Sequence, residues 1–181
     1  MSSADKAVAI LHSGGVIAYP TEGVFGLGCL PDHLSAVQRV LEIKQRDASK
    51  GLILIAADTA QLDGWIHLPA DTELPEPDPE KPITWVVPTA SKVKAIVRGD
   101  NVGIAVRLTT NPVARKICLA AESPIISTSA NLSGKPAASD QLSLHRQFRS
   151  LVDYIVPGDC GPATGPSEIR HLATGAVLRP R

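Results

Sequence analysis

The sequence has few aromatic residues and few cysteines, and both scarcities limit what the protein can be. Only 3% of the 181 residues are aromatic, so the core must be built from Val, Ile, Leu and Ala. The three cysteines, Cys29, Cys118 and Cys160, are widely spaced and form no Cys-x-x-Cys pair. This pattern favours neither a zinc site nor a disulfide framework. We therefore expect free thiols in a reducing compartment, and a cytoplasmic protein.

An excess of one charge and long apolar runs are also missing. Eighteen basic residues balance eighteen acidic residues, which argues against a protein that coats nucleic acid non-specifically but leaves a local basic pocket open. No apolar run approaches the ~20 residues needed to cross a bilayer. The first ten residues lack the basic and apolar segments of a secretory signal. We therefore expect no membrane contact.

Several familiar active-site motifs are absent as well. The sequence contains no G-x-x-x-x-G-K-[ST] phosphate loop and no G-x-S-x-G nucleophile elbow. The stretch GVFGLG at 23–28 has the order G-x-x-G-x-G, the reverse of the dinucleotide fingerprint, and we predict a loop there. The five histidines show no pair at metal-ligand spacing, so we predict no protein metal site and place them on the surface or at caps.

What is present is an alternation of strands and helices. Apolar runs predict strands at 16–20, 51–56, 83–88, 102–108, 124–128 and 154–157. Helical spacing predicts a first helix between a cap at Ser3 and a stop at Gly14, and a second that ends near Lys44. Further helices are predicted at 59–66, 91–97, 112–121 and 139–149, the third of these capped by Asn111 with Pro112 in its first turn.

The order of these elements predicts the fold class. Residues 69–82 are rich in proline and acids, which is typical of an exposed loop, and 167–180 read as two strands around an Ala-Thr-Gly turn. Alternating strands and helices favour an α/β fold, and the closing hairpin makes the sheet mixed rather than parallel. We therefore predict one α/β domain over residues 1–181.

Basic side chains follow predicted strands and helices at positions that suit a ligand. Lys44, Arg46 and Lys50 lie between a helix end and a buried strand, and ligands bind near strand ends in open α/β sheets. Three such cations would hold a polyphosphate, although basic residues also favour helix C-termini because of the helix dipole. Arg107 and Arg179 each end an apolar strand, so each needs a partner or a ligand.

The stretch STSANLSGKP at 127–136 follows a buried strand with small polar side chains. Ser127, Ser129 and Asn131 alternate, so in an extended chain they point to one face and form a hydrogen-bonding wall. The alternative is that they satisfy the backbone of a local turn. Without a nucleophile elbow, the pattern does not favour serine catalysis.

Five stretches together resemble the YrdC-like family of threonylcarbamoyl-AMP synthases: YPTEGVFGLGC, KQRDASKGLIL, VRLTTNPVA, STSANLSGKP and PSEIR…VLRP. They occur in the family's order across essentially the whole chain. The resemblance implies a twisted mixed sheet with helices packed on it and a concave basic cavity.

The resemblance also implies a reaction. L-threonine, bicarbonate or CO2, and ATP with Mg²⁺ would give threonylcarbamoyl-adenylate and pyrophosphate. The product would pass to a partner complex that makes threonylcarbamoyladenosine in tRNA. The alternative within the same fold is a module that binds tRNA, ribosomal RNA or double-stranded RNA and makes no adenylate.

The family motifs assign roles to particular residues. Catalytic roles fall on Lys44, Arg46 and Lys50, and threonine contacts on Thr21, Arg107 and Ser167. Nucleotide contacts fall on Arg46, Lys50, Ser129, Asn131 and Arg179. The chain differs from the commonest family pattern at Gly23, Phe25, Asp47, Ile55 and Ala137, and DPEKP at 78–82 replaces most of a Trp-Pro-Gly-Pro element.

Overall fold

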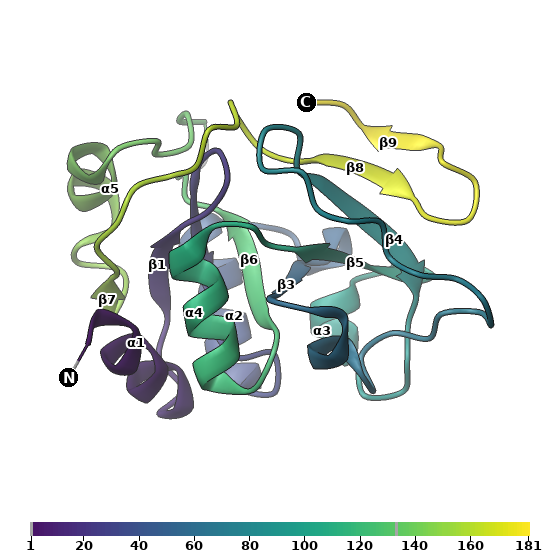
Figure 1. Cartoon of the computed structure of the whole chain (residues 1–181). Helices are drawn as coiled ribbons and strands as arrows, with labels where there is room; N and C mark the ends of the chain where they lie inside the picture. Colours follow the sequence, from purple (N-terminus) through teal and green to yellow (C-terminus); the bar gives the residue numbers. More distant parts are fainter. Residues whose placement is uncertain (1, 133) are drawn as a thin grey trace.

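The computed structural model describes residues 2–132 and 134–181, and their strands form one mixed sheet (Figure 1). The strand order is β7-β1-β2-β6-β3-β5-β4-β8-β9. The strands are β1 Ile17–Pro20, β2 Phe25–Gly28, β3 Ile53–Ala56, β4 Ile83–Pro88, β5 Gly103–Leu108, β6 Ile125–Ser129, β7 Tyr154–Ile155, β8 Glu168–His171 and β9 Val177–Arg179. The pairs β1–β7, β3–β5 and β4–β8 are parallel, whereas the other pairs are antiparallel. The predicted mixed α/β sheet is therefore confirmed.

Helices cover both faces of this sheet. The helices are α1 Ser3–His12, α2 Leu34–Lys44, α3 Ala95–Arg98, α4 Pro112–Ala121 and α5 Gln141–Phe148, with 3-10 turns η1 Ala48–Lys50 and η2 Thr59–Leu62. In Figure 1, α1 and α4 lie in front of the sheet, and α2 and α3 lie behind it. Buried strand residues alternate between the two layers: Leu54 packs with the α2 side and Ile55 with the α1 and α4 side. This period of two is what a doubly covered strand requires.

Capping residues fix where two helices begin. The Asn111 side chain accepts hydrogen bonds from the N–H groups of Val113 and Ala114, as predicted for the start of α4. At α1 the prediction was wrong by one residue, because Ser2 rather than Ser3 is the cap. Ser2 and Asp5 form a reciprocal capping box there.

Most predicted strands are confirmed within one or two residues, but the loop predicted at 23–28 is correct only for residues 23–24. Phe25–Gly28 forms strand β2, which pairs with β1 and β6. A Cβ atom on Gly28 would lie 2.1 Å from the carbonyl oxygen of Ile126, so the glycine permits close approach of the neighbouring strand. Gly28, one of the glycines that suggested a loop, therefore serves strand packing.

Two predicted helices are much shorter than expected. The 59–66 segment contains only the 3-10 turn Thr59–Leu62, and the 91–97 segment contributes only to α3, Ala95–Arg98. In the described part of the chain, no helix combines the length and apolarity that a bilayer crossing needs.

Candidate active site

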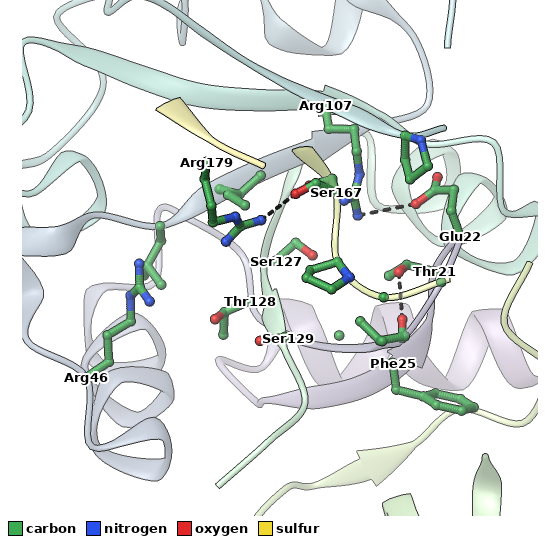
Figure 2. Close-up of a pocket in the computed structure, with 18 residues that line it drawn as sticks. Thr21, Glu22, Phe25, Arg46, Arg107, Ser127, Thr128, Ser129, Ser167 and Arg179 are labelled. Atoms are coloured by element: carbon green, nitrogen blue, oxygen red, sulfur yellow. Dashed lines mark hydrogen bonds and ion pairs between the residues drawn. The ribbon is translucent and has the colours of Figure 1, made fainter. Parts of the chain in front are cut away.

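The ends of several strands surround one cavity (Figure 2). The β1–β2 loop, the end of β6, Arg107 on β5, the segment just before β8 and Arg179 on β9 all contribute to its wall. The cavity encloses about 610 Å³, with open solvent at its mouth included. Its lining residues are Thr21, Glu22, Gly23, Val24, Phe25, Gly26, Arg46, Leu52, Ile53, Pro82, Arg107, Ser127, Thr128, Ser129, Gly165, Pro166, Ser167 and Arg179.

Three of the predicted cations converge on this cavity, namely Arg46, Arg107 and Arg179. Arg46 donates from Nε and Nη2 to the carbonyl oxygen of Gly51, at 3.2 and 2.9 Å. Arg179 donates from Nη2 to the carbonyl oxygen of Ser167, at 2.7 Å. Burial lowers the pKa of Arg179, and the charges of Arg107 and Arg46 lower it further. The guanidinium groups are therefore close enough to repel one another, which an anionic ligand would relieve.

Arg107 differs from the other two because it is ion-paired. Its Nη2 lies 3.3 Å from Oε2 of Glu22, and the two residues are 7% and 2% exposed. Oε1 of Glu22 accepts from the Thr109 hydroxyl at 2.6 Å and from the Thr110 N–H at 2.8 Å. Burial raises the pKa of Glu22, but the Arg107 charge and these donors outweigh it and hold the pKa below its usual value.

The role of Glu22 was missed from the sequence. The available signal was a carboxylate placed directly after a buried strand, in the stretch YPTE. Nε of Arg107 is buried and has no hydrogen-bond partner among the described residues. A buried donor without a partner next to a cavity is what a polar ligand would satisfy.

Lys44 does not line the cavity, but it contacts Ser129, which does. It is 9% exposed, and its Nζ donates at 2.7 Å to the carbonyl oxygens of Ser129 and Asn131, and also to Oδ1 of Asn131. The Ser129 hydroxyl donates to the same Oδ1 at 2.8 Å. Burial lowers the pKa of Lys44 to about 8, with a smaller effect of Arg46. Lys44 and Asn131 thus fix the turn after β6, while Ser129 lines the cavity together with Ser127.

A second cavity adjoins the first and is lined in part by Lys50; its volume is about 700 Å³ with open solvent at its mouth included. The two cavities share Arg46, Leu52, Ile53 and Arg179. Its other lining is mostly apolar, with a few polar groups: Lys50, Gly51, Val86, Arg98, Asn101, Gly103, Ala105, Ile169 and Leu178. The site is therefore a polar cavity and a more apolar one, with two arginines between them.

The remaining predicted residues, Thr21 and Ser167, both line the polar cavity. The Thr21 hydroxyl donates to the carbonyl oxygen of Val24 at 2.6 Å, so it closes the β1–β2 loop and caps no helix. The Ser167 hydroxyl is 2.7 Å from the hydroxyl of Thr84, and both residues are buried.

The loop at Gly23 is covered by the segment 161–165. The N–H of Gly161 donates to the carbonyl oxygen of Thr21. The N–H of Ala163 donates to the carbonyl oxygen of Glu22. A Cβ atom on Gly23 would lie 2.2 Å from the carbonyl oxygen of Gly165. A threonine at this position, common in the family pattern, would not fit this backbone.

Among the other departures from the family pattern, Phe25 lines the cavity, whereas Asp47, Ile55, Ala137 and residues 78–81 do not. Asp47 is exposed and does not line the cavity. Its side chain caps η1 by accepting a hydrogen bond from the N–H of Ser49. Ile55 is buried in the layer with α1 and α4. Ala137 is not a lining residue, and of residues 78–82 only Pro82 lines the polar cavity. Asp47 therefore brings no carboxylate into the lining.

The fold and this cavity define an α/β protein with a basic ligand site at the strand ends. The Sua5/YciO/YrdC family model, described as "Telomere recombination", matches residues 9–180. The chain therefore belongs to the Sua5/YciO/YrdC family.

Curated relatives match nearly the full length of the chain. A protein of Stenotrophomonas maltophilia named threonylcarbamoyl-AMP synthase is 44% identical over 182 residues, which cover 97% of this chain and 96% of that protein. A protein of the same name from Nitrosococcus oceani is 46% identical over 178 residues, with 96% and 95% covered.

A solved structure agrees in fold. The crystal structure of P. abyssi Sua5 complexed with L-threonine matches 99% of this chain with a TM-score of 0.86 and 28% identity. The match covers 55% of the Sua5 chain, so this chain spans little more than half of that protein.

Proposed function

We propose that this protein makes threonylcarbamoyl-AMP from L-threonine, bicarbonate or CO2, and ATP. The observation that carries the proposal is the convergence of Arg46, Arg107 and Arg179 on one cavity, with Ser127 and Ser129 in the same wall. The relatives named threonylcarbamoyl-AMP synthase support it, because they are 44–46% identical over nearly the whole chain.

Threonine would bind at the Arg107 end of the polar cavity. The unpartnered Nε of Arg107 would donate to the threonine carboxylate, and charge-assisted bonds of this kind are the strong ones. Thr21 and Ser167 line the same end and would contact the rest of the amino acid. The name of the threonine-bound Sua5 structure is consistent with an amino-acid site in this fold.

ATP would lie across the two cavities. Arg46 and Arg179 stand between them and would bind the triphosphate, with Ser129 on one side and Lys50 on the other. The more apolar cavity suits the nucleoside, because Val86, Ala105 and similar side chains offer a surface for the base. Lys44 and Asn131 would act through the turn that they hold, by placing Ser129.

The reaction needs positioning and charge neutralisation more than covalent help from the protein. The threonine amine attacks CO2 and loses a proton, which gives an N-carboxylate. An oxygen of this carboxylate then displaces pyrophosphate from the α-phosphorus in line. Guanidinium groups held by backbone carbonyls need little reorganisation as charge moves onto the leaving pyrophosphate.

The residues that the structure describes do not offer a protein site for Mg²⁺. Among the described residues, no group of three His, Cys, Asp or Glu side chains is placed to hold a metal ion. Glu22 is the carboxylate of the cavity lining, and Arg107, Thr109 and Thr110 already engage it. Mg²⁺ would therefore arrive with the triphosphate as part of the substrate.

The direct test is incubation with ATP, threonine, bicarbonate and Mg²⁺, followed by mass detection of threonylcarbamoyl-adenylate. We expect the adenylate to form only when threonine is present. RNA binding that weakens steeply with salt, without any adenylate, would instead favour the RNA-binding module.

Arg46→Ala should lower kcat/KM by about 10–100-fold, because a charge-assisted contact to the triphosphate is lost. Steady-state pyrophosphate release measures this effect. Arg149→Ala is a matched control, because Arg149 is exposed at the end of α5 and lines neither cavity. Unchanged turnover in Arg46→Ala would remove Arg46 from the site.

We further propose that the product passes in the cytoplasm to a partner complex that modifies tRNA. Direct contact with tRNA would depend on the basic groups at the opening of the polar cavity, because the chain as a whole carries no net charge. Stimulation of product release by the partner complex, measured with and without tRNA, tests both steps.

A further inference from the structure

The charges of the polar cavity are unevenly distributed. Arg107 has a carboxylate partner in Glu22. Arg46 and Arg179 bind main-chain carbonyl oxygens, and neither has an ion-pair partner within the described residues. The Arg107 end therefore has a fixed charge near zero, whereas the end with Arg46 and Arg179 is positive.

The position of Glu22 is specified by the surrounding structure. Its Oε1 is held by a hydroxyl and a backbone N–H from the residues that follow β5, the strand that carries Arg107. Its Oε2 accepts no hydrogen bond within the described residues and faces the Arg107 guanidinium. The ionised carboxylate is thus fixed beside the cation that a ligand would use.

The ligands expected at the two ends differ in charge in the same way. A free amino acid at neutral pH is a zwitterion without net charge, whereas a phosphate monoester group carries about −1.5 to −2. A carboxylate balanced by its own ammonium group can approach Arg107 beside Glu22. A phosphoryl group there would meet the Glu22 charge at short range, and like charges placed together are a common means of rejecting a wrong ligand.

We propose that Glu22 is a specificity-determining residue that keeps phosphoryl groups out of the Arg107 end and reserves it for a zwitterionic amino acid. This inference rests on the proposed function, because it takes threonine as the ligand of Arg107. It adds that the two substrates are sorted by charge before they react. Without Glu22, a phosphate group of ATP or inorganic phosphate would bind at Arg107 and block threonine.

The test compares wild type with Glu22→Gln, which keeps shape and removes charge. Binding of L-threonine is measured by calorimetry with and without inorganic phosphate, at ionic strength matched with chloride. In wild type, phosphate should change the threonine Kd by less than about twofold, and in Glu22→Gln it should raise the apparent Kd by about tenfold or more. Glu168→Gln is the matched control, because Glu168 is ion-paired with Arg170 and does not line the cavity.

Two results would overturn the inference. One is displacement of threonine by phosphate from wild type, which can be measured even if Glu22→Gln does not fold. The other is a folded Glu22→Gln protein, verified by its circular dichroism, in which phosphate leaves threonine binding unchanged. Failure of wild type to bind threonine at all would instead contradict the proposed function.

Discussion

At the scale of single residues, the protonation state of Lys44 affects the turn that places Ser129 in the site. Its ammonium group has three N–H donors, and the acceptors are the carbonyl oxygens of Ser129 and Asn131 and Oδ1 of Asn131. Because burial lowers the pKa of Lys44 to about 8, the group loses its charge and one donor just above neutral pH. The turn that places Ser129 is then held less firmly.

We therefore expect binding of a non-hydrolysable ATP analogue to weaken as the pH rises through about 8, since the protonated lysine is the form that holds the turn. Calorimetry from about pH 7 to about pH 9.5 measures this, a range in which an ordinary lysine stays charged. In Lys44→Arg the weakening near pH 8 should disappear, because a guanidinium stays protonated. Lys92→Arg, at an exposed lysine outside both cavities, should keep it.

At the scale of elements, the β1–β2 loop depends on close contact with the segment 161–165. Backbone hydrogen bonds join Thr21 to Gly161 and Glu22 to Ala163, so the segment lies directly against the loop that carries Glu22. Gly23 permits this contact because it has no side chain. Any side chain here must move the segment that supplies Gly165, Pro166 and Ser167 to the cavity.

Gly23→Ala should destabilise the fold by about 1–3 kcal/mol, as overpacking does, and weaken threonine binding. Chemical denaturation and calorimetry measure the two effects. Gly64→Ala is the comparison for backbone strain without overpacking, because Gly64 has a positive φ but only Cδ of Lys92 within 4 Å of its Cβ position, at 3.9 Å. A Gly23→Ala protein with wild-type threonine affinity would contradict the tight contact.

The strands and the site residues show how much of the structure could be predicted from the sequence. Strands such as 51–56 were predictable because their apolar runs reflect burial, and the Asn111 cap was predictable from local chemistry. Strand β2 was not, because two glycines in four residues suggest a loop until the neighbouring strand is known. In the site, the arginines were predicted to face a ligand and three of them do line one cavity. The Glu22–Arg107 pair was not predictable, because it depends on which strands become neighbours.

At the scale of the whole molecule, the sheet joins all parts of the chain. Strands from both ends of the sequence meet in one order, and β6 pairs with β2 on one side and β3 on the other. One core layer extends from Val16 in the β1 region to Ile104 and Val106 on β5. Each of the two core layers contains residues from both the N-terminal and the C-terminal parts of the chain.

We therefore expect residues 1–181 to unfold as a single domain in one transition. Far-UV circular dichroism and the fluorescence of Trp65 and Trp85 should give the same midpoint, as two-state behaviour requires. Both tryptophans pack in or against the same core layer, so they report on it together with the backbone signal. Two midpoints that differ between the probes would indicate two separately unfolding parts.

The cavity wall combines Thr21 and Glu22 from the first hairpin with Ser167 and Arg179 from the last. Contacts between segments so distant along the chain form slowly, since a long loop must close before they contribute free energy. During refolding from denaturant, helices and local hairpins can appear before these segments meet. Recovery of catalysis should therefore lag behind recovery of the helical circular dichroism signal. The return of turnover then reports when the last step of folding is complete.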